Sequence, residues 1–289
     1  MKILDFYQQK NKPVISLEFF PPKDPAAFDK VVDELILLKP DYVTVTFGAG
    51  GSTRDNSYHT VKKLIEDKNL PVVAYIAGYG LGPNDIKDVL DKYQALGIGT
   101  IFVIRGDKPR NVDFVSHPDS FHYAYEMIRF IKEHYNFTLG CAGYPEGHVE
   151  AESLEADIEH LKLKIDSGAD YIVTQYSYDN SLFSAYVEKC RAIGITVPII
   201  PGIMPVYSVK LTHSLAKLCG ASFPETMKQN LDKLAAADAD TVLAYGIDQA
   251  TELCRGLLDK GVPGLHFYTM DRSRSTSEII RRLKTEKRL

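Results

Sequence analysis

The stretch TIFVIRGDKP at residues 100–109 has the features of a strand that ends at a functional site. Apolar residues follow one another at 101–104, as they do in a strand that is buried on both faces. The run ends in Arg105, Gly106 and Asp107, and Pro109 prevents a regular continuation. A glycine between opposite charges lets a ligand approach the backbone with both side chains beside it. Taken alone, such a tripeptide is more often a strand-ending turn with a solvated ion pair, so the other strand ends decide the interpretation.

Apolar runs of similar length recur along the chain and alternate with amphipathic helical patterns. The runs predict further strands at 14–19, 42–47, 71–77, 137–143, 170–175, 197–201 and 264–269. Helical periodicity predicts helices at 24–38, 56–66, 84–96, 120–134, 152–166, 181–193 and 275–283. Roughly sixty residues separate the last two strands, more than one crossover needs, and predict two or three extra helices within 207–218, 224–235 and 241–260.

Near-equal strand–helix units of this kind predict an α/β fold, a (β/α)8 TIM barrel with extra helices between strands seven and eight. A doubly wound open sheet is the competing arrangement, but a barrel uses every predicted strand–helix unit. No linker rich in glycine, serine or proline divides the chain. We therefore expect a single catalytic barrel domain over 1–289.

Composition excludes several classes of function. The formal net charge is −4, which gives no support for nucleic-acid or membrane-surface binding. No apolar run reaches the length of a membrane span, and the first residues lack the apolar core of a signal peptide, so a cytoplasmic protein is expected. Cys141, Cys190, Cys219 and Cys254 lack the paired spacing of a zinc site or a redox dithiol. They are interpreted as structural thiols, and no metal site is expected.

Polar residues stand at the predicted strand ends, where a barrel of this kind has its active site. Side chains alternate along a strand, so Ser16 and Glu18 share one face of the first strand. Phe19 and Val45 then point toward the helices, while the polar set lines the barrel mouth. This set consists of Glu18, Thr46, Arg105, Asp107, Tyr144, Gln175 and Tyr268.

Glu18 stands between Leu17 and two phenylalanines and is expected to be shielded from water. Burial favours the protonated form of a carboxyl, and a glutamic acid that is protonated near neutral pH can serve as a general acid. A structural glutamate paired with a lysine or arginine explains the sequence equally well. Asp107 beside Arg105 should stay ionised, which would give two carboxyls separate roles in one pocket.

Phosphate-binding motifs in their standard forms are absent from the sequence. The dinucleotide fingerprint ends in a glycine at a fixed spacing from two earlier glycines. After the glycines at 48, 50 and 51, Thr53 occupies that last position. After the glycines at 78, 80 and 82, Pro83 occupies it. Tight turns explain both clusters, although loop glycines and helix N-termini could still hold a nucleotide. The histidines at 117, 122, 148 and 266 lack metal-ligand spacing, so surface or core positions are expected for them.

A series of segments, in this order, resembles the methylenetetrahydrofolate reductase family in its short bacterial form, which has the catalytic domain alone. The segments are SLEFFPP (16–22), TVTFGAGGSTRD (44–55), IRGDKP (104–109), GYPEGHVEA (143–151), DYIVTQ (170–175), PIIPGIMPV (198–206) and HFYTMDR (266–272). They extend over almost the whole chain, and EFFPP, RGD and YPExH are specific jointly rather than singly. The resemblance implies a (β/α)8 barrel flavoprotein oxidoreductase with non-covalent FAD at the strand ends. Such an enzyme takes hydride from NADH or NADPH and reduces 5,10-methylenetetrahydrofolate to 5-methyltetrahydrofolate.

The resemblance also implies roles for individual residues. Glu18 matches the general acid that assists opening of the five-membered folate ring, and Asp107 matches the carboxylate that stabilises the resulting cation. Both would contact the folate, Gln175 would contact both substrates in turn in ping-pong kinetics, and Arg272 would contact the folate tail. The positions that match flavin contacts are Thr46, Phe47, Tyr75, Arg105, Gly106, Asp107, Tyr123, Ala124, Ala142, Tyr144, His148, Ala151, Asp157 and Lys164.

Three positions depart from the family pattern. The tetrapeptide YIAG at 75–78 stands where many members have HLTC, so a flavin-contacting histidine becomes Tyr75, which can still hydrogen-bond and stack. Phe47 replaces a frequent tyrosine, and Val209 stands near a phenylalanine that positions nicotinamide or folate. Because valine cannot stack, the donor stays open between NADH, the default expectation, NADPH, and electrons from a partner subunit.

Other functions fit parts of the sequence. A non-redox barrel lyase or aldolase would use Glu18 as its acid and bind no flavin. A non-catalytic folate-binding or scaffold subunit is a third class, against which the intact pair of Glu18 and Asp107 argues. The family commonly forms dimers or tetramers, so a homo-oligomer is expected, and its chemistry serves both methionine biosynthesis and anaerobic one-carbon metabolism.

Overall fold

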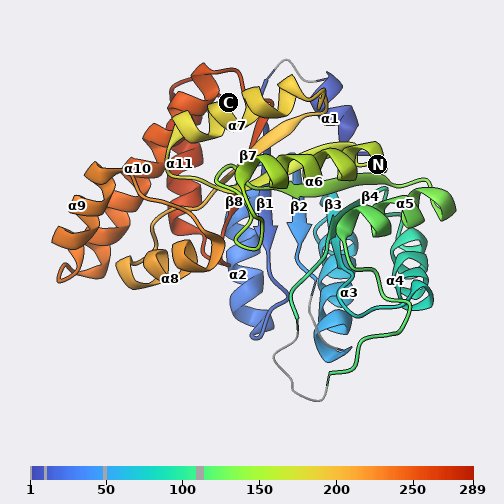
Figure 1. Cartoon of the computed structure of the whole chain (residues 1–289). Coiled ribbons are helices and arrows are strands. Elements are labelled where there is room, and N and C mark those ends of the chain that lie inside the picture. Colours follow the sequence, from blue (N-terminus) through green and yellow to red (C-terminus); the bar gives the residue numbers. More distant parts are fainter. Residues whose placement is uncertain (1, 10–11, 48–50, 109–113) are drawn as a thin grey trace.

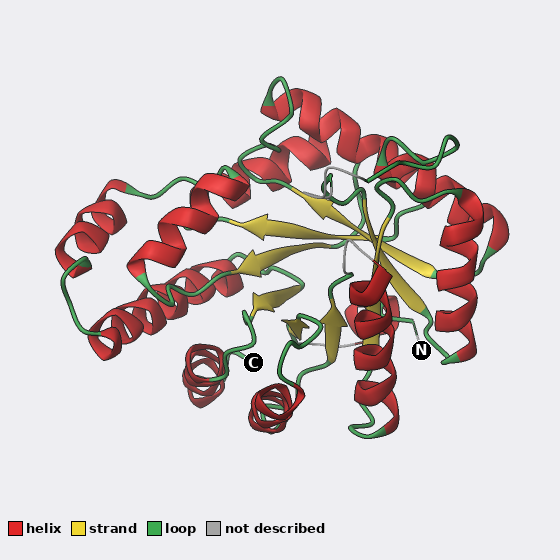
Figure 2. Ribbon diagram, turned by 90° about the horizontal axis from the view of Figure 1, so that it is seen from below, coloured by secondary structure: helices red, strands yellow, loops and turns green. Residues whose placement is uncertain are grey.

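Eight parallel strands close into a barrel in the computed structural model, which describes residues 2–9, 12–47, 51–108 and 114–289. Each strand pairs with the next along the chain, and the last pairs with the first. Helices surround the strands (Figures 1 and 2). The predicted (β/α)8 barrel is confirmed, and the pairing of the first and last strands rules out an open doubly wound sheet.

The strands lie close to the ranges that the sequence predicts. They are β1 (Val14–Phe19), β2 (Tyr42–Val45), β3 (Val72–Ala77), β4 (Thr100–Ile104), β5 (Thr138–Gly143), β6 (Tyr171–Tyr176), β7 (Ile199–Ile203) and β8 (Gly264–Tyr268). The helices are α1 (Leu4–Gln9), α2 (Pro25–Ile36), α3 (Gly51–Glu66), α4 (Pro83–Ala95), α5 (Ala124–His134), α6 (Leu154–Asp166), α7 (Asn180–Ala192), α8 (Val209–Cys219), α9 (Glu225–Leu234), α10 (Ala239–Asp259) and α11 (Arg274–Thr285). Three of them, α8 to α10, fill the long connection between β7 and β8, as predicted.

Several element boundaries differ from the predictions. β7 continues through Pro201 to Ile203 instead of ending at 201. Its pairing with β6 is irregular between Val173 and Tyr176. Such an irregular ladder can accommodate Pro201, which has no backbone N–H to donate. α3 begins at Gly51 rather than at 56, so part of the predicted glycine-rich loop is helical. Residues 48–50 of that loop, and Pro109, lie outside the described residues.

The N-terminal boundary of α5 is also later than predicted. The helix begins at Ala124 rather than at 120. A carboxylate oxygen of Glu126 accepts hydrogen bonds from the backbone N–H groups of His122 and Tyr123, and this capping fixes the start of the helix.

The outer faces of the strands pack against the helices. Phe19 and Val45 are buried in this outer core, as side-chain alternation predicts. The Phe19 ring meets the Phe28 ring of α2 edge-on, with 5.6 Å between ring centroids. α2 starts where it does because the side chain of Asp24 accepts hydrogen bonds from the first backbone N–H groups and Pro25 occupies the first helical position.

The barrel interior is rich in aromatic side chains. Tyr75 stacks on Phe102 with 4.5 Å between ring centroids, and Phe102 in turn contacts Tyr171 at 6.0 Å. Gly140 makes room for these rings, because a Cβ atom there would lie 2.4 Å from Tyr171 and 2.5 Å from Phe102. This packed layer lies beneath the barrel mouth and supports the side chains there.

A short helix, α1, closes the N-terminal end of the barrel (Figure 1), and the sequence patterns did not predict it. Ile3 is 1% exposed, and its backbone N–H donates to Thr100 Oγ1 at 3.1 Å. The hydroxyl groups of Tyr7 and Tyr42 are hydrogen-bonded at 2.9 Å, which joins α1 to β2. The apolar residues of the chain start therefore belong to the barrel core.

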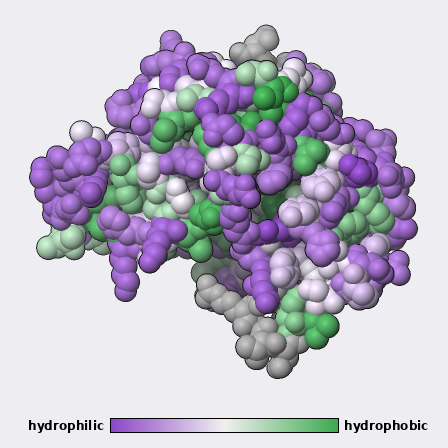
Figure 3. All heavy atoms as spheres, in the orientation of Figure 1, coloured by the Kyte–Doolittle hydropathy of each residue, from purple (hydrophilic) through white to green (hydrophobic). Residues whose placement is uncertain are grey.

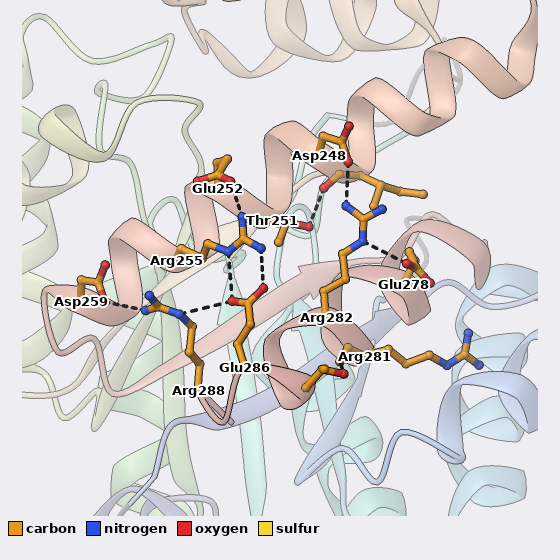
Figure 4. A network of polar contacts seen from close by, with 12 residues as sticks. Asp248, Thr251, Glu252, Arg255, Asp259, Glu278, Arg281, Arg282, Glu286 and Arg288 are labelled. Atoms are coloured by element: carbon orange, nitrogen blue, oxygen red, sulfur yellow. Dashed lines mark hydrogen bonds and ion pairs between the residues drawn. The ribbon is translucent and has the colours of Figure 1, made fainter.

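The final helix, α11, is fastened to α10 by a network of ion pairs (Figure 4). Arg282 pairs with Asp248 at 2.6 Å, and Arg255 pairs with Glu286. These pairs are partly exposed, so each contributes no more than about 1 kcal/mol. Most of the stabilisation of α11 comes from its buried apolar side chains, Ile279, Ile280 and Leu283.

The surface in Figure 3 is largely hydrophilic, and three of the four cysteines are buried. On the face shown in Figure 3, apolar residues lie in separate areas among hydrophilic ones. No helix in the described part of the chain is long and apolar enough to cross a membrane. Cys141, Cys190 and Cys254 are buried and free, and burial raises the pKa of the Cys141 thiol to about 11, which fits a structural role.

Replacing Ile3 with alanine should lower the free energy of unfolding by about 2–4 kcal/mol, because it leaves a cavity where α1 enters the barrel. Urea denaturation measures the change. Gln8→Ala is the matched control, since Gln8 is exposed on α1, the helix that directly follows Ile3, and its effect should stay below about 0.5 kcal/mol. Equal stability of Ile3→Ala and the wild type would contradict the role of α1 as a structural closure.

Candidate active site

Glu18 lies on β1 with its side chain in the barrel mouth and is 4% exposed. The hydroxyl of Tyr75 on β3 donates to Oε2 of Glu18 at 2.7 Å. Nε2 of His266 on β8 lies 3.6 Å from the same oxygen. No lysine or arginine among the described residues pairs with this carboxyl. The contacts thus disfavour the structural ion pair that the sequence left open, and they leave the general-acid hypothesis in place.

His266 supports the site, a role that the sequence patterns did not reveal. Its Nδ1 is hydrogen-bonded to Ser16 Oγ at 2.8 Å, and both residues are fully buried. Its Nε2 has no hydrogen-bond partner among the described residues. The signal that could have found it is the pairing of β8 with β1, which sets His266 beside Ser16 on the face that carries Glu18.

Tyr75, a predicted flavin contact, faces Glu18 in the structure. Burial, followed by the nearby charge of Glu18, raises the pKa of Tyr75 well above its ordinary value. The phenol therefore stays protonated at neutral pH and remains a hydrogen-bond donor to Glu18.

The sequence Arg105, Gly106, Asp107 follows β4 at the mouth, as predicted. Gly106 has φ +81, and a Cβ atom there would lie 2.9 Å from that of Ala77, so a side chain would not fit. Nη2 of Arg105 pairs with Glu150 at 2.7 Å, a contact that the sequence did not reveal. An ion pair of Arg105 with Asp107, the alternative interpretation of this tripeptide, is not among the contacts of the described residues, and Asp107 is exposed.

A second set of predicted residues gathers between β5 and α6. The Tyr144 ring meets the His148 ring edge-on, with 4.7 Å between centroids. Nζ of Lys164 lies 5.7 Å from the centroid of the Tyr144 ring and donates to the carbonyl of Ala142 at 3.0 Å. This lysine places a positive charge beside an aromatic ring, which suits an anionic or planar ligand.

Asp157 and Ala151 complete this set. Asp157 lies in the first turn of α6 and is 6% exposed, and its burial raises the pKa of its carboxyl. Ala151 donates its backbone N–H to the carbonyl of His148 at 2.9 Å, which fixes the loop that carries the histidine.

Tyr123 and Ala124 mark the start of α5, on the outer side of this set. Tyr123 is 52% exposed, while Ala124 is buried. The Tyr123 ring is stacked with Tyr125 at 5.7 Å and with His160 of α6 at 6.4 Å between centroids. These rings present a flat aromatic surface on which a planar ring could stack.

Thr46 and Phe47 follow β2. The carbonyl of Thr46 accepts a hydrogen bond from Ser57 Oγ at 3.1 Å. Phe47 is half-buried and packs against both the inner and the outer core. Both residues directly follow the carboxyl end of β2.

Gln175 and Arg272 are the predicted substrate contacts on the remaining strands. Gln175 lies on β6, half-buried, and its Oε1 accepts the backbone N–H of Tyr176 at 3.1 Å. Arg272 follows β8, exposed, with its guanidinium 5.3 Å from the centroid of the Tyr207 ring. It lines a cavity of about 570 Å³, together with Lys30 and other residues of α2 and α10.

Tyr268 connects the two parts of the site. Burial raises the pKa of Tyr268 well above its ordinary value, and the nearby Glu18 carboxyl and Tyr144 phenol raise it further. Its hydroxyl donates to the carbonyl of Thr174 at 2.9 Å. Tyr268 is also the register partner of Glu18, and both Glu18 and Tyr144 are near enough to affect its pKa.

Comparison with known proteins gives a consistent match. Residues 2–284 match the family model described as methylenetetrahydrofolate reductase. The chain is 35% identical over 280 residues to methylenetetrahydrofolate reductase 1 of Schizosaccharomyces pombe, covering 95% of this chain and 46% of that protein. It is 33% identical over 301 residues to methylenetetrahydrofolate reductase (NADH) 1 of Arabidopsis thaliana, covering 98% and 51%. The chain thus spans about half the length of these curated relatives.

A bacterial relative is matched over most of its length. The 5,10-methylenetetrahydrofolate reductase of Escherichia coli is 32% identical over 268 residues, covering 92% of this chain and 88% of that protein. Among solved structures, an uncharacterized protein from Clostridium thermocellum that binds two copies of 5-methyl-5,6,7,8-tetrahydrofolic acid has a TM-score of 0.65 at 17% identity, covering 99% and 98%. At that identity the structural likeness supports the fold alone.

The buried carboxyl of Asp157 predicts a pH dependence of stability. Because its folded pKa lies above the ordinary value of 3.8, the folded state holds this proton more tightly than the unfolded state does. The protonated Asp157 carboxyl therefore contributes its full stabilisation below pH 3.8, and this stabilisation is lost as pH rises through the folded pKa. Asp157→Asn should raise the urea midpoint relative to the wild type at pH 7, and the gain should shrink toward pH 4.

Glu159→Gln is the control for this prediction, since Glu159 is exposed on the same helix. The urea midpoint of Glu159→Gln should stay close to that of the wild type at every pH. A gain from Asp157→Asn that does not change with pH would contradict the role assigned to the buried charge.

Proposed function

Because the chain belongs to the methylenetetrahydrofolate reductase family, we propose that it reduces 5,10-methylenetetrahydrofolate to 5-methyltetrahydrofolate, using bound FAD and a reduced nicotinamide. The observation that carries the proposal is the environment of Glu18. Its carboxyl is 4% exposed at the barrel mouth and receives a hydrogen bond from Tyr75. No lysine or arginine among the described residues pairs with this carboxyl, so it can donate a proton to a bound substrate.

The residues at the mouth fit a flat, polar cofactor. Thr44 Oγ1 and His266 Nε2 are buried and lack hydrogen-bond partners among the described residues, so polar atoms of a bound molecule could satisfy them. Bound FAD would supply the hydride-transfer chemistry between the nicotinamide and the folate. The residues proposed to hold it are Thr46, Phe47, Arg105, Gly106, Asp107, Tyr123, Ala124, Ala142, Tyr144, His148, Ala151, Asp157 and Lys164.

Glu18 supplies the proton that the folate reaction needs. The five-membered ring of the substrate opens when a ring nitrogen takes the proton of Glu18, its bond to the methylene carbon breaks, and an iminium cation forms. The negative charge of Asp107 stabilises this cation electrostatically. Hydride addition to the methylene carbon then gives the methyl group, and Glu18 regains a proton before the next turnover.

Gln175 and Arg272 bind and orient the substrates. The side chain of Gln175 projects from β6 at the mouth and serves the nicotinamide and the folate in turn, which gives ping-pong kinetics. The guanidinium of Arg272 lines the cavity beside α2 and pairs with the carboxylates of the folate tail.

NADH is the proposed donor, since the Arabidopsis relative is a methylenetetrahydrofolate reductase (NADH). Val209, the first residue of α8, has no ring to stack on a nicotinamide. Delivery of electrons by a partner subunit is therefore the second possibility, and the same experiment distinguishes the two.

The test is the visible spectrum of the purified protein under anaerobic conditions. We expect flavin bands that bleach when NADH is added and return when methylenetetrahydrofolate is added, because one bound flavin serves both half-reactions. Bands that bleach with dithionite but not with NADH would replace the proposed donor by NADPH or a partner subunit. Absence of flavin bands after incubation with FAD would contradict the proposed function and favour a non-redox barrel lyase.

A further inference from the structure

The two oxygens of the Glu18 carboxyl have different surroundings. Oε2 accepts the hydrogen bond of Tyr75 at 2.7 Å, and His266 Nε2 lies 3.6 Å from the same atom. Among the described residues, none donates a hydrogen bond to Oε1. The barrel interior thus supports one oxygen of this carboxyl and leaves the other available to a ligand in the mouth.

Packing holds Tyr75 in the position that makes this contact. Its side chain is 6% exposed, and its ring stacks on Phe102 with an interplanar angle of 23°. Phe102 is itself fixed against Tyr171, beneath the mouth. A ring confined in this way loses little conformational entropy when its hydroxyl binds Glu18, so the contact is preorganised.

The contact also spans an intervening strand. β2 lies between β1 and β3, and Thr44 on β2 is the register partner of Glu18. Thr44 Oγ1 has no hydrogen-bond partner among the described residues, so Tyr75 reaches over the adjacent residue to bind the carboxyl. A tyrosine has the length for this, with its hydroxyl beyond the end of the ring.

The chemistry of the two groups decides which oxygen carries the acidic proton. A phenol hydroxyl can donate or accept a hydrogen bond, and in this structure the Tyr75 hydroxyl donates to Oε2 of Glu18. When Glu18 is protonated, Oε2 is therefore the oxygen that accepts from Tyr75, and the proton resides on Oε1. That proton is then directed away from the aromatic interior and toward the substrate.

We infer that Tyr75 is a positioning residue for the folate reaction, which holds Oε2 of Glu18 so that the acidic proton on Oε1 faces the substrate. The inference rests on the proposed function and assigns Tyr75 a task other than the flavin contact that the sequence predicts. It also gives a chemical reason for a tyrosine at a position where the sequence departs from the family pattern.

Tyr75→Phe tests the inference, because it removes the hydroxyl and keeps the ring on Phe102. In rapid-mixing experiments on the FAD-loaded protein, oxidation of the reduced flavin by methylenetetrahydrofolate should slow by about 10-fold or more, the range expected for loss of a hydrogen bond to a charged group. Flavin reduction by the donor and the Kd for FAD should change by less than about 2-fold, well under the effect of one such hydrogen bond.

Tyr171→Phe is the matched control. Tyr171 is fully buried in the same interior, contacts the same Phe102 ring, and has a hydroxyl without a hydrogen-bond partner among the described residues. Removing that hydroxyl should leave both half-reactions at the wild-type rate. If only Tyr75→Phe slows the oxidation of the reduced flavin by the folate, the effect is not a general consequence of removing a buried hydroxyl.

Infrared spectroscopy of the protein without cofactor reads the contact itself. The difference between the wild type and Glu18→Gln identifies the carboxyl band of Glu18, which should shift in Tyr75→Phe and stay unchanged in Tyr171→Phe. An unshifted band, or a loss confined to FAD binding and flavin reduction, would overturn the positioning role alone. A wild-type protein that fails to reduce the folate would overturn the proposed function and this role together, even if the band shifts.

Discussion

The carboxyl group of Glu18 is buried in an aromatic barrel mouth, and no lysine or arginine of the described residues neutralises it. Burying a carboxylate without partners is costly, so the surroundings have to supply hydrogen bonds. Tyr75 supplies one to the side chain, and Thr269 Oγ1 binds the backbone carbonyl of Glu18 at 2.6 Å. Phe102 holds Tyr75 in place. The acid therefore depends on the packing beneath it, and that packing depends on the closed end of the barrel at α1.

The barrel separates stability from chemistry by using the two faces of each strand differently. Outward side chains such as Phe19 and Val45 bury apolar surface against the helices and keep the sheet closed. Inward side chains are then free to be polar at the carboxyl ends, where Glu18 and the residues after β4 and β5 gather. The aromatic layer below them, with Gly140 making room for Tyr171 and Phe102, prevents the mouth from collapsing inward.

Much of this arrangement follows from local pattern. Alternation along β1 placed Glu18 inside and Phe19 outside, and the regular spacing of strands and helices predicted the closed barrel, because both follow from backbone geometry. The contact of Tyr75 with Glu18 and the place of His266 depend on which strands become neighbours and how far side chains reach across them. The pairing of Arg105 with Glu150 depends on the path of a distant loop. Such contacts between residues far apart in the sequence cannot be predicted from local pattern. The helix α1 was not predicted because it is too short to show a helical periodicity.

The measurement that tests the central claim most directly is the effect of Glu18→Gln on the two half-reactions, followed separately in an anaerobic stopped-flow instrument. Glutamine keeps the shape and the hydrogen-bond acceptor of the side chain but has no acidic proton. The account predicts that flavin reduction by the donor stays near the wild-type rate, while reduction of methylenetetrahydrofolate falls at least ~100-fold. Equal losses in both half-reactions would contradict the assignment of Glu18 as the proton donor to the folate.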